Sequence, residues 1–262
     1  MKAMYRIILM VVAVTLLALS VPVWASATET DERIVSSAKK SYVFKTYLKD
    51  DIINIASKDG VVTLTGTVSE DPHKTLAEET VVSLPGVKSV DNRLELKGER
   101  AAENTDVWVG IKVKTTLMFH RNLSASKTDI QVKDGVVTLR GEAASPAQID
   151  LATEYVKDVE GVKDVKNEMT VSKAPKKSDE KTMGEKMGDV GESIDDASIT
   201  ALAKMTLLYH RSTSALHTKV VTNQGVVSLD GVAKNAAEKD LVTKFVIDVH
   251  GVKSVVNNMT IK

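Results

Sequence analysis

Alternation of apolar and polar side chains marks short strands at three places along the chain, each lying between two stretches of helical periodicity. In the first, Val61, Thr63 and Thr65 face one way and Val62 and Leu64 the other. A period of two residues is that of a β-strand with one face buried. The chain therefore predicts small units that combine helices with a sheet.

A hairpin is predicted at each of these strands. A second short apolar run, with Ile53 and Ile55, comes just before the first of them. The pair Asp59-Gly60 lies between the two runs, as Asp134-Gly135 does in the second copy, where a tight turn requires a positive φ. Two antiparallel strands joined by a short turn follow.

Helical spacing occurs both before and after each hairpin. Asp71 before Pro72, and Ser145 before Pro146, are typical of a helix N-cap followed by proline at the first helical position. Apolar residues then recur at i, i+4 and i+7, the stripe of a helix that buries one face. The positions after the hairpins are Ala77, Val81, Leu84; Ala152, Val156, Val159; and Val242, Val246, Val249. Those before them are Ile34, Ala38, Tyr42; Val109, Val113, Leu117; and Ile199, Ala203, Leu207.

Two motifs show that these units are repeats. Asp-Gly-Val-Val-Thr-Leu-Thr-Gly at 59–66 recurs in similar form at 134–141 and 224–231, and Gly-Val-Lys-Ser-Val-Asp-Asn at 86–92 recurs at 161–167 and 251–257. In every copy the second motif begins 26 residues after the first glycine of its hairpin. A final strand, such as Val90 to Leu96, follows each second motif, so the unit is αββαβ. The glycines expected at turns are Gly60, Gly66, Gly86, Gly135, Gly141, Gly161, Gly225, Gly231 and Gly251.

The predicted fold class is α+β, with three tandem αββαβ domains. Each has a mixed three-stranded sheet covered on one face by two helices, because a βαβ crossover places the third strand parallel to a neighbour. The expected boundaries are 30–97, 103–172 and 193–262. Residues 173–192, rich in lysine, acidic residues and glycine, are interpreted as a flexible linker.

Residues 1–27 are typical of a secretory signal peptide. Lys2 and Arg6 precede an apolar run from Ile7 to Val23, and Ala25-Ser26-Ala27 fits a cleavage site before Thr28. The alternative is an uncleaved inner-membrane signal anchor, since the run is near the shortest length that spans a bilayer. We expect an exported, periplasmic protein.

Charge and cysteine content narrow the classes of function. Without residues 1–27 the chain keeps 33 of its 35 Lys and Arg against 35 Asp and Glu. Nucleic-acid binding normally needs a basic excess, so nucleic acid is not an expected partner. The chain has no cysteine, which excludes disulfides, thiolate chemistry and an acyl anchor on cysteine.

These motifs resemble those of the BON domain (bacterial OsmY and nodulation). Its Gly-Val-Val-x-Leu-x-Gly hairpin and its Gly-Val-x-x-Val-x-Asn motif match all three copies. The resemblance implies a periplasmic or outer-membrane-associated protein linked to osmotic or envelope stress that binds phospholipid surfaces. Separately, three small domains of nearly equal size with compact cores leave no obvious deep cleft and share no polar constellation, so we expect no enzyme activity and no cofactor.

The histidines are the strongest candidates for chemistry. Phe119-His120-Arg121 and Tyr209-His210-Arg211 occupy equivalent places at a helix end, where the first copy has Phe44-Lys45-Thr46. No nucleophile or acid recurs beside them, so we interpret them as partners of the helix dipole. His210 and His217 lack a third ligand, so they are expected to be surface residues and no metal site is predicted.

The candidate lipid contacts are cationic or aromatic. Lys88, Lys163 and Lys253 recur in the three Gly-Val-Lys turns. A helix C-terminus favours a cation there, but three equivalent lysines could also bind an anionic surface multivalently. Trp108, with Lys112 and Lys114, suits a membrane interface or partial burial against a neighbouring domain. The first functional hypothesis is therefore binding to anionic phospholipid, and the second is a stress-induced chaperone or scaffold that binds envelope proteins.

Overall fold

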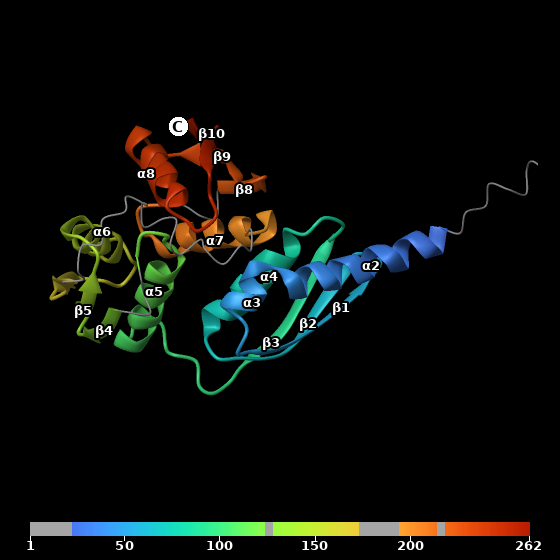
Figure 1. Cartoon of the computed structure of the whole chain (residues 1–262), viewed down its shortest axis with the longest axis horizontal. Coiled ribbons are helices and arrows are strands. Elements are labelled where there is room, and N and C mark those ends of the chain that lie inside the picture. Colours follow the sequence, from blue (N-terminus) through green and yellow to red (C-terminus); the bar gives the residue numbers. More distant parts are fainter. Residues whose placement is uncertain (1–22, 124–127, 173–193, 214–217) are drawn as a thin grey trace, which may run out of the picture.

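The computed structural model describes residues 23–123, 128–172, 194–213 and 218–262, which form three αββαβ units (Figure 1). Domain 1 consists of α2 (Val23–Lys40), α3 (Tyr42–Thr46), β1 (Ile52–Lys58), β2 (Val61–Val68), α4 (Asp71–Val82) and β3 (Ser89–Leu96). Domain 2 consists of α5 (Asp106–Phe119), β4 (Thr128–Lys133), β5 (Val136–Ala143), α6 (Pro146–Lys157), β6 (Asp164–Asn167) and β7 (Thr170–Val171). Domain 3 consists of α7 (Asp196–Tyr209), β8 (Thr218–Asn223), β9 (Val226–Ala233), α8 (Ala236–Ile247), β10 (Ser254–Asn257) and β11 (Thr260–Ile261).

The predicted mixed sheet is confirmed in each domain. In domain 1 the order is β1-β2-β3, with β1 antiparallel and β3 parallel to the central β2. In domains 2 and 3 the third strand is divided into two short segments, and both segments pair parallel with the central strand. The parallel pairing arises because the second helix of each unit carries the chain back to the start of the sheet.

The hairpin turn of each domain is held by a carboxylate from the preceding helix. Asp59 and Gly60 both have positive φ, 54° and 81°, the conformation of a tight hairpin turn. One carboxylate, that of Asp31, accepts hydrogen bonds from both of their backbone N–H groups, at 2.8 and 2.9 Å. Asp106 and Asp196 hold the other two turns in the same way. The repeated turn is therefore fixed by the first helix as well as by its own glycine.

The asparagine that closes the second motif ties the third strand to the second helix. In domain 2, the Asn167 side chain donates to the Ile149 carbonyl and to the Thr153 hydroxyl, at 2.9 and 2.8 Å. Its carbonyl oxygen accepts from the Met169 N–H. Asn92 and Asn257 make the corresponding bonds from strand to helix. This polar bridge explains why the same residue type stands at that position in all three copies.

Two predicted details of the helices are wrong. The first helix does not continue to Tyr42 as one stripe. It stops at Lys40, and Ser41 begins the short α3, whose buried residue is Val43. Asp71 is not the N-cap of α4, because Glu70 holds that position without a side-chain hydrogen bond. Ser145 does cap α6, accepting from the Gln148 N–H.

The buried apolar side chains of all three domains form one continuous cluster. Helix α4 of domain 1 packs on α7 of domain 3, and α5 of domain 2 also contacts α7. Polar contacts reinforce this junction: Lys204 pairs with Glu79 at 2.6 Å, and the Tyr47 hydroxyl donates to the Met118 carbonyl. Domain 1 therefore docks on the first helices of the other two domains.

Some predictions concern parts of the chain outside the described residues. Residues 1–22 of the signal sequence and the linker at 173–192 lie there, as does His217. The predicted cleavage site before Thr28 falls within α2. Among the helices that the structure describes, none has the length and apolar character needed to cross a membrane.

Candidate binding groove between the domains

An open groove of about 610 Å³ lies where the three domains meet. One wall is the start of α4 and the connection from β3 to α5, and the other is the start of α5 with the end of α7. Its apolar lining includes Leu96, Val107, Trp108, Ile111 and Leu208. Val107 and Leu208 remain 66% and 41% exposed, so the groove presents apolar surface to solvent.

The groove contains Trp108 and Lys112, two of the residues that the sequence singled out. Trp108 is half-buried, and the Lys112 ammonium lies 3.5 Å from the centre of its ring, a cation–π contact. The same ammonium is 5.5 Å from the Tyr209 ring and 2.7 Å from a Glu160 carboxylate oxygen. Lys112 is 9% exposed, so it acts inside the groove wall rather than as a surface cation.

The position of Trp108 depends on local features of domain 2. The Thr105 hydroxyl caps α5 by accepting from the Trp108 N–H at 3.3 Å. The indole lies against Gly161, where an added Cβ would approach the ring to 3.2 Å and Val109 to 2.7 Å. A glycine at this turn therefore makes room for the indole as well as adopting φ of 92°.

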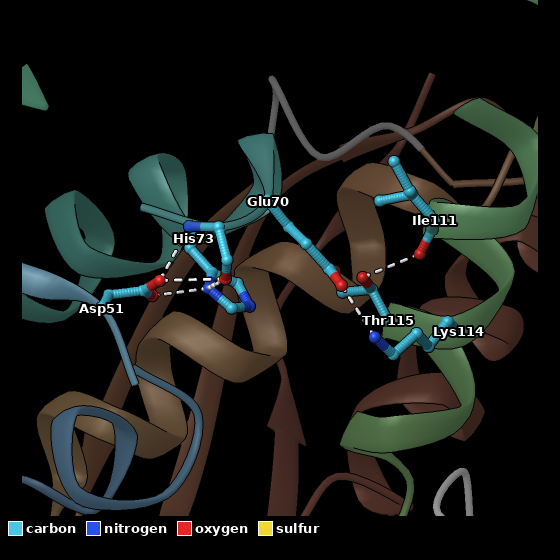
Figure 2. Close-up of polar contacts among 7 residues, drawn as sticks. Asp51, Glu70, His73, Ile111, Lys114 and Thr115 are labelled. Atoms are coloured by element: carbon cyan, nitrogen blue, oxygen red, sulfur yellow. Dashed lines mark hydrogen bonds and ion pairs between the residues drawn. The ribbon is translucent and has the colours of Figure 1, made fainter. Parts of the chain in front are cut away.

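The domain 1 side of the groove is fixed by a cluster around Asp51 (Figure 2). The buried Asp51 carboxylate lies 2.6 Å from Nδ1 of His73 and accepts from both the N–H and the hydroxyl of Ser69. The Ser69 hydroxyl donates to Asp51 and lies 3.4 Å from the same Nδ1. Activation of a nucleophile would need the serine on the opposite ring nitrogen, so this cluster is a clamp on the start of α4. Sequence reasoning missed it, because neither Asp51 nor His73 belongs to a repeated motif.

Lys114 links domain 2 to domain 1 at the edge of the groove. Its ammonium lies 2.7 Å from Oε1 of Glu70 (Figure 2). The other carboxylate oxygen of Glu70 is buried and has no hydrogen-bond partner among the described residues. Burial, together with the charges of Asp71 and Glu70, raises the pKa of the nearby Tyr209, which stays a neutral hydroxyl.

The three turn lysines lie apart from the groove, one on each hairpin turn. The stem of Lys88 covers Gly60, that of Lys163 covers Gly135 and that of Lys253 covers Gly225. Each backbone N–H donates to the carbonyl of its glycine, as from Lys88 to Gly60 at 2.8 Å. The side chains are exposed, and the Lys253 ammonium also donates to the Gln224 carbonyl. All nine glycines expected at turns have positive φ.

The two repeated histidines do not lie where they were expected. His120 and His210 are 0% and 1% exposed and face each other between domains 2 and 3. The interpretation of His210 as a surface residue is therefore wrong. Pairing with the helix dipole fails for His120 as well, because burial, then the charges of His210 and His250, lower its pKa to about 3 and keep the ring neutral. Among the described residues no group of three histidine or acidic side chains is placed to hold a metal ion.

Comparison with known proteins agrees with this repeated architecture. The family model of the BON domain matches residues 30–98, 105–173 and 195–262, which is most of the chain. The chain belongs to the BON domain family. The three BON domains correspond to the three αββαβ units, and the groove lies at their common junction.

Two curated proteins resemble this BON protein in sequence. Osmotically-inducible protein Y of Escherichia coli (strain K12) is 32% identical over 157 residues, covering 60% of this chain and 73% of that protein. The 21 kDa hemolysin of Actinobacillus pleuropneumoniae is 25% identical over 146 residues, covering 54% and 74%. A solved structure, the C-terminal domain of CdsD from the type III secretion system of Chlamydia trachomatis, aligns over 84% of this chain and 95% of that chain with 15% identity and a TM-score of 0.23.

Proposed function

We propose that this BON protein is an exported, periplasmic envelope protein of the osmotic stress response that binds anionic phospholipid surfaces and has no catalytic role. The relative named for osmotic induction supports the stress response. The observation that carries lipid binding is the groove, because its exposed apolar rim lies next to cationic side chains at the junction of the three domains.

An apolar groove beside cations suits a phospholipid in two respects. Val107, Leu208 and the half-buried Trp108 offer contacts for an acyl chain or the interfacial region. The exposed Lys97 lines the same groove and can face a headgroup phosphate, whereas Arg100, also in the lining, is paired with Asp71 at 2.7 Å. In this proposal Lys112 holds the Trp108 ring in place, while Lys114 keeps domain 1 against domain 2.

The turn lysines add a multivalent contribution. Lys88, Lys163 and Lys253 are exposed at equivalent points of the three domains. Each lysine near an anionic surface contributes about 1 kcal/mol, and linked weak contacts reinforce one another. The proposal therefore expects binding to depend on lipid charge and to weaken as salt shortens the screening length.

Co-sedimentation of residues 28–262 with neutral and anionic liposomes, at low and at physiological salt, tests the proposal. We expect pelleting only with anionic vesicles, and reduced pelleting when Lys88, Lys163 and Lys253 are all changed to Gln. The matched control changes Lys58, Lys133 and Lys219 to Gln, which removes the same charge from exposed positions on β1, β4 and β8. Equal losses of vesicle binding in both triple variants would mean that the turn lysines act only through the net charge of the chain. Absence of binding to anionic vesicles would refute the proposal.

A second candidate function, binding of other envelope proteins as a chaperone or scaffold, is favoured by one feature. β3 pairs only with β2 among the described residues, and its eight residues leave a strand edge available to an extended peptide. Suppression of a client's aggregation in the absence of lipid would support this function over lipid binding.

A further inference from the structure

Domains 2 and 3 join through an approximately two-fold arrangement of backbone hydrogen bonds. Arg121 of domain 2 donates to the Asp248 carbonyl at 2.8 Å, and Arg211 of domain 3 donates to the Asp158 carbonyl at 2.9 Å. A second equivalent pair runs the other way, from His250 to Phe119 at 3.1 Å and from Glu160 to Tyr209 at 3.3 Å. Each domain therefore contributes the end of its first helix and the turn after its second helix to the same interface.

Stacked rings fill the centre of this interface. His120 stacks on Tyr155 with ring centres 3.9 Å apart, and His210 stacks on Phe245 at 3.8 Å. The two imidazoles meet at 6.0 Å across the approximate axis. Domain 1 carries no such ring: Lys45 and Thr80 stand at the equivalent positions. The ring cluster therefore belongs to the pairing of domains 2 and 3 alone.

The two histidines of the cluster differ in whether a carboxylate lies beside the ring. Nδ1 of His210 lies 3.2 Å from the Asp158 carboxylate, an ion-pair distance for a protonated ring although not a well-directed hydrogen bond. Burial alone would raise the pKa of Asp158, but contacts with His210 and Ser212 outweigh it and hold that pKa below its ordinary value. His210 therefore has a carboxylate counterion at hand.

His120 has no such counterion. Neither of its ring nitrogens makes a hydrogen bond of good geometry in the described structure. The Asp248 carboxylate on the other side is occupied by the Tyr155 hydroxyl, which donates to it, and is approached by Asn122. The titratable or charged groups around His120 are His210 from the end of α7, Asp248 and His250 from the turn after α8, Tyr155 from α6, and Arg121 from its own segment.

We propose that the contact between domains 2 and 3 is a proton-sensitive latch, closed while His120 is neutral and opened when His120 takes up a proton. A charge on a buried ring without a counterion is tolerated only after the domains separate and water reaches it. His250 acts in the same direction, since burial, then the charge of Arg121, lowers its pKa.

The direction and size of the effect follow from linkage. The pKa of His120 is lower in the closed state than its ordinary value of 6.5. The neutral ring therefore stabilises the closed state above pH 6.5, and this stabilisation is lost as pH falls from there toward about 3. Between about pH 7.5 and about pH 5, proton uptake by His120 alone shifts the opening equilibrium by about 30-fold. Opening would also part α5 from α7, which form one wall of the groove, although the latch does not depend on lipid binding.

Amide hydrogen exchange measured by NMR on the lipid-free chain at both pH values tests the latch. The reporters are the N–H groups of Arg121, Glu160, Arg211 and His250, which bond across the interface. After correction for intrinsic exchange rates, we expect their protection factors to fall by at least about 30-fold at the lower pH. Amides of the central strand β2 in domain 1 serve as internal controls and should keep their protection.

Two substitutions at the pseudo-equivalent positions separate the latch from general acid sensitivity. His120→Phe keeps a ring against Tyr155 and removes the titrating group, so only the part of the change due to His250 should remain. His210→Phe, the matched control, should keep the full change, because His210 lies beside the Asp158 carboxylate, a counterion that His120 lacks. His120→Gln repeats the test if Phe disturbs packing. An undiminished pH response in both His120 variants, or no response in the parent chain, overturns the proposal, and neither result bears on lipid binding.

Discussion

One carboxylate, that of Asp195, both caps α7 and contributes to the docking of domain 1 onto domain 3. Oδ1 of Asp195 accepts from the Ser198 N–H at 2.9 Å, which caps α7. Oδ2 of the same carboxylate accepts from the Tyr42 N–H at 2.8 Å, at the start of α3 in domain 1. The Ser198 hydroxyl donates to Oδ2 and accepts from the Val43 N–H at 3.1 Å. Replacing this side chain should therefore weaken one helix and one contact between domains together.

The two effects can be separated by the choice of substitution. Asp195→Ala removes both, at about 1 kcal/mol for the cap and about 1.5 kcal/mol for a backbone bond to a charged acceptor. Asp195→Asn keeps a good capping oxygen for Ser198 but places an NH₂ group where Oδ2 met the Tyr42 N–H. The expected loss for Asn is thus only the interdomain part, about 1.5 kcal/mol.

Residue-level hydrogen exchange reports separately on the two amides that donate to the two oxygens of this carboxylate. In Asp195→Asn we expect the Tyr42 amide to lose protection by roughly 10-fold while the Ser198 amide is unchanged. In Asp195→Ala both amides should lose protection, and Tm should fall by roughly 5 to 10 °C. Full protection of Tyr42 in both variants would refute the reasoning, since it would mean that domain 1 docks without this contact.

Three further predictions concern other parts of the fold. Gly66→Ala should lower the free energy of unfolding in urea by about 3 kcal/mol, because φ is 119° and a Cβ would lie 2.0 Å from the Ile52 carbonyl oxygen; no loss would contradict that geometry. Tyr155→Phe should cost about 2 kcal/mol and increase exchange at the Arg121 amide, because it removes the hydroxyl that donates to Asp248; an unchanged exchange rate would argue against that contact. Hydrogen bonds from Ser57 and Gly60 lower the pKa of Asp31, so its contribution to stability is present above its ordinary pKa of 3.8 and lost as pH falls below it. Thermal unfolding of Asp31→Asn should therefore show a lower Tm near neutral pH that converges with the parent chain in acid, and parallel curves would contradict this assignment.

The sequence by itself determined the repeated unit, because the signals for that unit are local. Alternation over β2, the turn at Asp59-Gly60 and the helical stripe of Ala77 and Val81 each involve neighbours within a few residues. The same order of helix, hairpin, helix and strand signals in all three copies then favoured the αββαβ interpretation. Where local signals competed, as at Ser41, where the helix stops and a second begins, the sequence prediction was wrong.

Only the tertiary structure decided the roles of the residues that differ between the three repeats. Trp108 and Lys112 could be foreseen as candidates, but their placement in a groove needed the contact of α5 with α7 and of domain 1 with both. The burial of His120 could not be foreseen, since its surroundings come from Tyr155 and from Asp248 of another domain. Local periodicity specifies which face of an element is buried, whereas the pairing of domains depends on side chains distant in sequence that meet only once each domain has folded.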